Sequence, residues 1–342
     1  MTVAQRVGQL FLVGLAGDAA GPAVAAEVRA YHFGSFLFGA DSSAGVADIQ
    51  AVTRTVQSLA SAEATGGARF LIAANQEGGE VQQLQGPGFS AIPTAVEQGL
   101  LQPGVLQRQA GQWGAELRTA GVNLDLAPVM DTVPPGTAAQ NQPIGALQRE
   151  FGGDPVTVAA HGVAFLRGMR QAGVATTIKH FPGLGRVLGN TDFTADVVDT
   201  VTGPGDPYLQ PYRAAIGAGV PFAMVALATY TRIDPSRLAV FSARVIGGML
   251  RGELHFQGVV VSDDLGVAAA VAGITPGARA IGFLNAGGDL ITSETAAAAE
   301  EMDTAVLAQA DADPAFRGVV DAAVMRVLAA KQAAGLLPCA QG

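Results

Sequence analysis

The sequence predicts a single (β/α)8 barrel, an α/β TIM-barrel fold in which eight parallel strands alternate with helices. Short apolar runs recur along the whole 342-residue chain, and each is followed by glycine or polar residues. Alanine-rich segments with helical spacing separate these runs. Hydrophobic residues make up 49% of the chain and charged residues only 14%, which is enough for a large buried core. An open, doubly wound sheet shows the same alternation and is the alternative fold.

Eight apolar runs are expected to form the strands, because each is too short for a helix and is rich in Val, Ile, Leu or Phe. Near-continuous apolarity is typical of strands that are buried on both faces. In chain order, the runs cover residues 10–13, 35–38, 69–74, 122–126, 175–179, 222–226, 259–262 and 289–292.

Helical spacing is clearest in two segments. The first carries Val158, Val163, Leu166 and Met169, and the second carries Val320, Val324, Val327 and Leu328. No linker, internal repeat or shift of composition divides the chain. We therefore expect residues 1–342 to form one domain.

Charge and cysteine content exclude several functional classes. The formal net charge is −9 and no run of Lys or Arg is present, which argues against nucleic-acid or anionic-membrane partners. No segment reaches the roughly 18 apolar residues of a membrane span. Cys339 is the only cysteine, so no disulfide framework exists. We expect a monomer that binds a small neutral or cationic molecule.

The first 17 residues lack a basic segment and a signal-peptide cleavage site. As written, the chain is expected to be cytoplasmic. An exported or lipid-anchored form from which the signal has been trimmed stays open.

In a barrel, catalytic residues gather at the carboxyl ends of the strands. Polar motifs follow three of the predicted strands. They are Asn-Gln-Glu-Gly-Gly at 75–79, Lys-His-Phe-Pro-Gly at 179–183 and Ser-Asp-Asp-Leu at 262–265. These side chains are therefore expected at one mouth of the barrel.

Asp263 follows an apolar run directly, so its carboxylate is expected to face the pocket. The alternative is a helix N-cap, because an Ala-rich segment follows Asp264. Two adjacent aspartates can divide these roles, with one facing the substrate and the other capping.

Lys179 and His180 end a buried strand, where charged groups are costly unless they are paired or bind a ligand. They are candidates for donating hydrogen bonds to sugar hydroxyls. Lys179 is also a candidate for a Schiff-base lysine of the aldolase type. A third interpretation is a structural ion pair with Asp125 or Asp131.

Residues 183–199 are expected to form a flexible lid, because glycines at both ends of 183–189 permit hinge-like motion. The glycine spacing does not fit a dinucleotide-binding loop. The lid carries Asn190 and Asp192, followed by Asp196 and Asp199, and can deliver a carboxylate to the mouth.

No cofactor and no metal are expected. The histidines at 32, 161, 180 and 255 fall in separate segments, without a close pair at ligand spacing. A serine-hydrolase elbow of the type Gly-x-Ser-x-Gly is also missing from the sequence.

Taken together, these motifs resemble glycoside hydrolase family 3, and within it the single-domain β-N-acetylglucosaminidases of cell-wall recycling. The resemblance covers nearly the whole chain, through motifs at 7–11, 75–79, 126–131, 149–152, 179–183 and 262–265 in this order. It implies retaining removal of a terminal β-linked N-acetylhexosamine from cell-wall or chitin-derived saccharides. It also implies that Asp263 attacks the anomeric carbon, and that Arg149, Lys179 and His180 hold the terminal sugar.

The chain departs from the family pattern at two sugar-binding positions. Asn75 stands where the family has an aspartate, and Gln83 stands where it has an arginine. Both positions normally contact sugar hydroxyls. We therefore expect Asn75 and Gln83 to contact the sugar ring, but with part of the recognition altered.

The lid departs as well. The family's acid/base is a histidine supported by an aspartate two residues before it, and the matching positions hold Asp192 and Asn190. Retaining glycosidases in general pair a protonated carboxyl with a nucleophilic one. Asp192 is therefore the predicted acid, with its pKa raised by Asp263 and by desolvation. Asp196 and Asp199 are rivals for this role, and a turn-capping Asp192 is the alternative.

Two further expectations concern the acceptor of the sugar and the rival functions. An ionised carboxylate on the lid repels phosphate, so hydrolysis rather than phosphorolysis is expected. The rival functions are a sugar-binding barrel with weakened catalysis, which the changes at Asn75 and Gln83 favour, and an aldolase centred on Lys179.

Overall fold

The computed structural model describes residues 1–15, 17 and 19–338, and Cys339 lies outside the described residues. Eight strands form the central sheet: β1 (Phe11–Leu15), β2 (Ser35–Phe38), β3 (Leu71–Ala74), β6 (Leu124–Asp125), β7 (Ala175–Phe181), β9 (Phe222–Val225), β12 (Val259–Ser262) and β13 (Ile291–Ser293). Their order in the sheet is β12-β9-β7-β6-β3-β2-β1-β13, and all neighbouring strands are parallel.

The sheet closes on itself. Val261 of β12 forms a parallel bridge with Leu290, the residue before β13. The Ser262 N–H also donates to the Leu290 carbonyl oxygen at 2.9 Å. The barrel prediction is therefore confirmed, and the open-sheet alternative is wrong.

Every predicted run overlaps one of the barrel strands, and the strands at 35–38 and 259–262 have the predicted bounds. The strand predicted at 122–126 is shortened to β6. Its flank is held by a side chain in addition to backbone hydrogen bonds, because Asn123 Oδ1 accepts from the Ile72 N–H at 2.8 Å and Asn123 Nδ2 donates to the Phe70 carbonyl at 3.1 Å.

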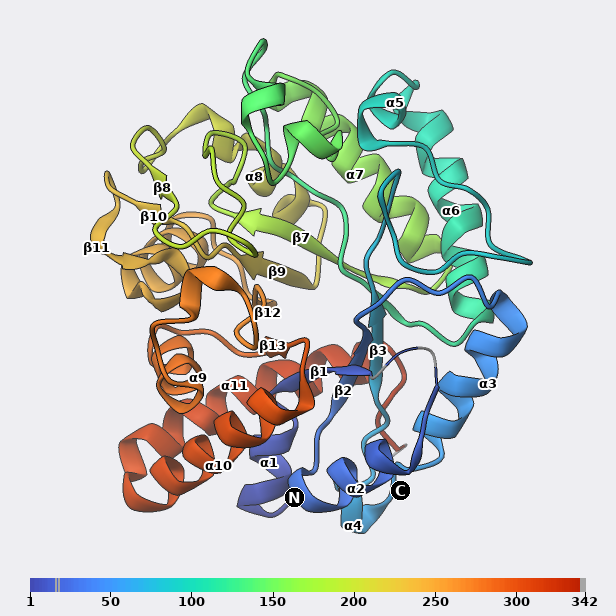
Figure 1. The fold of residues 1–342 in the computed structure, drawn as a ribbon, viewed down its shortest axis with the longest axis vertical. Coiled ribbons are helices and arrows are strands. Elements are labelled where there is room, and N and C mark those ends of the chain that lie inside the picture. Colours follow the sequence, from blue (N-terminus) through green and yellow to red (C-terminus); the bar gives the residue numbers. More distant parts are fainter. Residues whose placement is uncertain (16, 18, 339–342) are drawn as a thin grey trace.

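Helices surround the barrel (Figure 1). They are α1 (Val3–Gly8), α2 (Pro22–Tyr31), α3 (Val46–Gln57), α4 (Ala62–Thr65), α5 (Ala95–Gly99), α6 (Pro103–Thr119), α7 (Pro155–Gln171), α8 (Gln210–Gly217), α9 (Pro276–Asn285), α10 (Ala296–Ala312) and α11 (Pro314–Ala333), with a π-helix at Arg244–Glu253. In α7, proline at the first position and the Asp154 carboxylate, which accepts from Val156 N and Thr157 N, begin the helix. The two predicted helical segments are confirmed as parts of α7 and α11.

Short strands occur in the loops that follow the carboxyl ends of the barrel strands. The hairpin of β4 (Gln76–Gly78) and β5 (Val81–Gln82) follows β3. A three-stranded sheet joins β8 (Val198–Asp199), β10 (Thr229–Tyr230) and β11 (Asp234–Leu238). Among the described residues, no helix has both the length and the apolar character needed to cross a membrane.

Candidate active site

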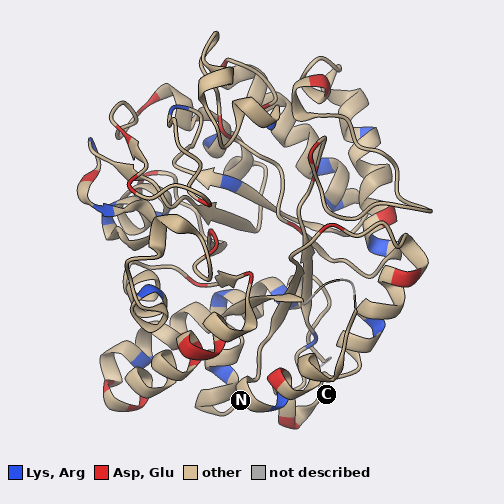
Figure 2. Ribbon diagram, in the orientation of Figure 1, with Lys and Arg blue, Asp and Glu red and all other residues tan. Residues whose placement is uncertain are grey.

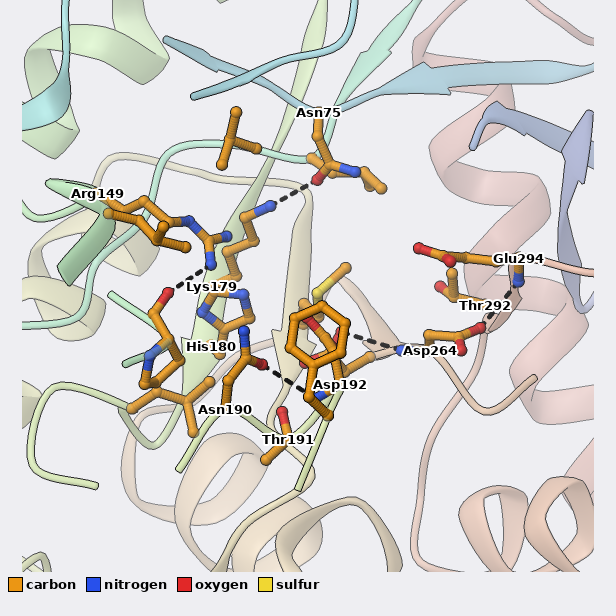
Figure 3. Close-up of a pocket in the computed structure, with 18 of the residues that line it drawn as sticks. Asn75, Arg149, Lys179, His180, Asn190, Thr191, Asp192, Asp264, Thr292 and Glu294 are labelled. Carbon is orange, nitrogen blue, oxygen red and sulfur yellow. Dashed lines mark hydrogen bonds between the residues drawn. The ribbon is translucent and has the colours of Figure 1, made fainter. Parts of the chain in front are cut away.

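A pocket of about 280 Å³ lies at the carboxyl ends of the barrel strands (Figure 3), where a barrel is expected to carry its site. It contains all of the predicted site residues except Gln83. Its lining is formed by Leu37, Asn75, Val81, Leu126, Pro143, Leu147, Arg149, Lys179, His180, Leu184, Asn190, Thr191, Asp192, Phe193, Met224, Asp263, Asp264, Thr292 and Glu294. The volume is at the small end of ligand pockets, so it fits a single small ligand better than a long one.

The two aspartates after β12 have different surroundings. The Asp264 carboxylate accepts hydrogen bonds from four backbone N–H groups, those of Gly266, Val267, Ala268 and Glu294, at 2.7–3.0 Å. Asp263 accepts one, from the Asp264 N–H at 3.0 Å, and lines the pocket. Asp264 thus holds the loop in shape, which leaves Asp263 available to a ligand.

The lid, residues 183–199, places Asp192 at the same pocket. Asn190 Oδ1 accepts from the Asp192 N–H at 3.0 Å, and the Asn190 carbonyl accepts from Phe193 N and Thr194 N. Asn190 therefore stabilises the turn. This is the capping role that was considered as the alternative for Asp192. The Asp192 carboxyl itself has no hydrogen-bond partner in the described part of the chain.

The tip of the lid is docked on the loop that follows β12. Ala269 N donates to the Asp192 carbonyl oxygen and Ala270 N donates to that of Thr191, both at 3.1 Å. These bonds bring Asp192 towards Asp263. The rivals Asp196 and Asp199 do not line the pocket, and the buried Asp199 carboxylate accepts from Val201 N and Thr202 N at 2.7 Å.

Burial in the pocket and the neighbouring Asp263 carboxylate raise the pKa of Asp192 to about 6, although His180 and Arg149 act in the opposite direction. A carboxyl with such a pKa is still partly protonated near neutral pH. It can therefore donate a proton while another carboxylate acts as nucleophile, which is the division of roles found in retaining glycosidases.

Glu294 is a pocket residue that the sequence analysis missed. It follows β13 directly and lines the pocket beside Asp264. Desolvation, together with Asp264, Asp192 and Asp263, raises the pKa of Glu294 to about 7. Its position after the eighth apolar run was the available signal, because the same rule drew attention to the residues after the third, fifth and seventh runs.

The opposite side of the pocket is formed by Asn75, Arg149, Lys179 and His180, which we call the binding wall. Arg149 makes two hydrogen bonds to the buried Glu77 carboxylate, at 2.7 and 2.8 Å, and Lys179 Nζ lies 2.6 Å from the same group. Burial alone would raise the pKa of Glu77, but the two cations outweigh it and lower this pKa to about 2. Glu77 therefore fixes Arg149 and Lys179 in place as charged donors.

The structural ion pair considered for the Lys179–His180 motif is formed by His180 with Asp131, whereas the partner considered for Lys179 is wrong. Lys179 Nζ binds Glu77 and Asn75 Oδ1, each at 2.6 Å. Only His180 of this motif contacts Asp131. A lysine held as a cation by a carboxylate is a poor Schiff-base nucleophile, because that reaction needs the neutral amine. These contacts count against the aldolase.

His180 is oriented by a buried carboxylate. Its Nδ1 lies 2.7 Å from Asp131 Oδ2, and Asp131 Oδ1 also accepts from the Tyr212 hydroxyl and the Leu184 N–H, both at 2.8 Å. Burial would raise the pKa of Asp131, but His180 and these hydrogen bonds keep it below its usual value. With Nδ1 bound to Asp131, the Nε2 of His180 is the nitrogen left for a ligand.

Both Lys179 and His180 line the pocket although they are neighbours in one strand. Side chains of a regular strand alternate between its two faces. The pairing of β7 with β9 shifts register between Ile178 and Phe181, and such an irregularity redirects side chains next to active sites. This local irregularity lets one strand supply two polar groups to the same pocket.

Gln83 lies behind Asn75 and not in the pocket. The side-chain Oε1 of Gln83 accepts from the backbone N–H of Asn75 at 2.7 Å, and the backbone N–H of Gln83 donates to the Asn75 carbonyl at 3.1 Å. Asn75 in turn accepts from Lys179 and lines the pocket. In this structure, Gln83 therefore supports a binding residue.

Within residues 1–15, 17 and 19–338, no three His, Cys, Asp or Glu side chains are arranged to hold a metal ion. A closed parallel barrel with a lid carboxyl, a strand-end carboxylate and a wall of donors at its mouth defines a barrel of the glycoside hydrolase class.

The sequence model of the glycosyl hydrolase family 3 N-terminal domain matches residues 2–330, and the chain belongs to this family. The family resemblance seen in the sequence is thereby confirmed, and membership implies a saccharide substrate.

Individual relatives agree with this assignment. A β-hexosaminidase from Stenotrophomonas maltophilia is 39% identical over 235 residues, which span 65% of this chain and 66% of that relative. The structure of a β-N-acetylhexosaminidase from Beutenbergia cavernae is 49% identical, with a TM-score of 0.96, and the match covers 97% of this chain and 99% of that one. A family 3 β-N-acetylglucosaminidase from a Paenibacillus species is 29% identical with a TM-score of 0.88, over 100% of this chain and 65% of that one.

Proposed function

We propose that this protein is a retaining, exo-acting glycoside hydrolase that removes a terminal β-linked N-acetylhexosamine from cell-wall or chitin-derived saccharides. The observation that carries the proposal is that Asp192 and Asp263 line one pocket, opposite the binding wall, and that Asp192 remains partly protonated near neutral pH. The names of the relatives described above support the same sugar.

In the first step, an Asp263 oxygen attacks the anomeric carbon and the bond from that carbon to the leaving oxygen breaks. Asp192 gives its proton to the leaving oxygen, so the aglycone departs as a neutral alcohol. In the second step, a water molecule attacks the same carbon and gives a proton to Asp192. The bond to Asp263 breaks, and both carboxyls return to their starting states.

The binding wall holds the terminal sugar in this scheme. Arg149, Lys179 and the Nε2 of His180 donate to its hydroxyl and acetamido groups, and Asn75 contributes an amide. Because Glu77 and Asp131 already hold these donors in place, little conformational entropy is lost when the sugar binds.

The proposal is tested with an aryl N-acetyl-β-glucosaminide. Wild-type protein is expected to release the aryl group, whereas Asp263→Asn is expected to lose at least about 10³-fold in kcat. Asp196→Asn is the matched control, because it removes a lid carboxylate that does not line the pocket. Its activity is expected to stay close to that of the wild type.

Mass spectrometry with a fluorinated N-acetylhexosamine reagent identifies the nucleophile. An adduct on Asp263 supports the covalent mechanism, and an adduct on another carboxyl refutes the assignment. Tight binding of N-acetylglucosamine without turnover by the wild type would favour the sugar-binding alternative.

A further inference from the structure

Glu294 presents a carboxyl to the pocket without a hydrogen-bond or ion-pair partner among the described residues. Its backbone, in contrast, is firmly held. The Glu294 N–H donates to Asp264 Oδ1 at 2.8 Å, and Gly14 packs so closely that a Cβ there would lie 2.1 Å from the Glu294 carbonyl oxygen. The fold therefore positions the backbone at Glu294, and the carboxyl is left available to a ligand.

Glu294 lies on the side of the pocket to which a leaving group would extend. A sugar held by Arg149 and Lys179 must place its anomeric carbon at Asp263, so the next sugar continues away from the binding wall. Figure 3 shows Arg149 and Lys179 on one side of the pocket and Glu294 with Asp264 on the other, with Asp192 between the two sides. Glu294 is thus next to the position of the neighbouring sugar and not of the terminal one.

Phe193 flanks the same position. It adjoins Asp192, lines the pocket and is 82% exposed, which is unusual for a phenylalanine. An exposed aromatic ring beside the acid can pack against the apolar face of a sugar. Phe193 therefore supplies a contact that does not depend on charge, and Glu294 supplies one that does.

The charge on this side of the pocket is strongly negative. Glu294 lies in the field of Asp192, Asp263 and Asp264, whereas the cations of the binding wall are already shared with Glu77. Acidic residues are also seen on the loops around the centre of the barrel (Figure 2). A neighbouring sugar with an ammonium group would be attracted here.

We propose that Glu294 is a specificity-determining residue that binds the protonated amine of an amino sugar next to the cleaved one. The favoured substrates are then partly de-N-acetylated oligosaccharides with an N-acetylated terminal sugar. This proposal rests on the proposed function, because it requires the terminal sugar to be cleaved at Asp263.

Two disaccharides test it. They share a terminal β-linked N-acetylglucosamine and differ only in whether the second sugar carries a free amine or an acetamide. Wild type is expected to have the higher kcat/KM for the amine. Glu294→Gln keeps the shape of the side chain, and we expect it to lower the amine-to-acetamide ratio of kcat/KM by about tenfold. On an aryl glycoside, which has no amine, this variant is expected to stay within about twofold of the wild type.

Two further variants separate the contributions. Phe193→Ala is expected to lower kcat/KM for both disaccharides by similar factors and to leave their ratio unchanged. Glu301→Gln removes one exposed negative charge on α10 outside the pocket. This variant is expected to change neither kcat/KM for the two disaccharides nor their ratio.

An unchanged ratio in Glu294→Gln would overturn the specificity proposal while leaving the proposed function intact. An equal loss by this variant on the aryl glycoside would also overturn it, because the residue would then act in the chemistry. If the wild type cleaved none of the three substrates, the proposed function would fail and the specificity proposal with it.

Discussion

The replacement of Asp192 by alanine tests the acid/base assignment most directly. A pKa of about 6 makes this carboxyl about 90% protonated at pH 5 and about 1% protonated at pH 8. If the protonated form is needed, wild-type kcat/KM on a disaccharide should fall about tenfold per pH unit above pH 7. Asp192→Ala should lack this decline and should lose about 10²- to 10⁴-fold at pH 5, the usual contribution of a general acid.

The leaving group provides the internal control. An aryl oxide with a low pKa departs without protonation, so kcat/KM for an activated aryl glycoside should fall much less in Asp192→Ala than kcat/KM for the disaccharide. Azide should restore turnover of the aryl glycoside, because it can occupy the space left by the carboxyl and attack the glycosyl enzyme. Asp196→Ala, on the same lid but outside the pocket, should show neither effect.

Equal losses on both substrates would refute the reasoning, since they would indicate a role in binding or in lid structure. A decline in wild-type activity above pH 7 that persists in Asp192→Ala would also contradict it. Glu294, whose pKa is raised to about 7, would then be the next acid to test.

Two other predictions follow from charge and burial. In phosphate buffer the free sugar and not the sugar 1-phosphate is expected as the main product, because Asp192, which is ionised once it has protonated the leaving group, repels a phosphate anion from the glycosyl enzyme; product analysis by mass spectrometry checks this. Burial raises the pKa of Asp125 to about 7, above its value of roughly 3.9 in an unfolded chain, so the stability that comes from its protonation is lost progressively as the pH rises from about 4 to about 7. Asp125→Asn should therefore raise Tm at pH 8 by about 2 °C or more and by less at pH 5, and an equal shift at both pH values would contradict the assignment.

The barrel was predictable because parallel strands buried on both faces leave a local signal. Runs such as 35–38 and 259–262 are apolar throughout, and their meaning does not depend on which strands lie beside them. The positions of Asp263, Lys179 and His180 were predictable for a related reason. A residue that follows a buried strand of a barrel must lie at the carboxyl end, whatever its partners are.

Pairings inside the pocket were not predictable in the same way. Glu77, Asp125 and Asp131 all follow or end barrel strands, so each was a reasonable partner for Lys179. In the structure Lys179 pairs with Glu77, and no residue pattern in β7 indicates this choice. Gln83 was expected at a sugar because its position in the family pattern suggested it, but the short β4–β5 hairpin folds its side chain back onto Asn75.

The two sides of the pocket differ in how their charges are balanced, and this difference explains how an aspartate can serve on the lid. On the binding wall, Glu77 already pairs with Arg149 and Lys179, and Asp131 with His180, before any ligand arrives. On the other side, burial and the neighbouring Asp263 carboxylate raise the pKa of Asp192, so this acid keeps part of its proton near neutral pH. As the glycosidic bond breaks, the sugar gains positive charge, which the Asp263 carboxylate stabilises. The nucleophile therefore helps to hold the acid ready and also stabilises the transition state, without the imidazole that the family pattern places on the lid.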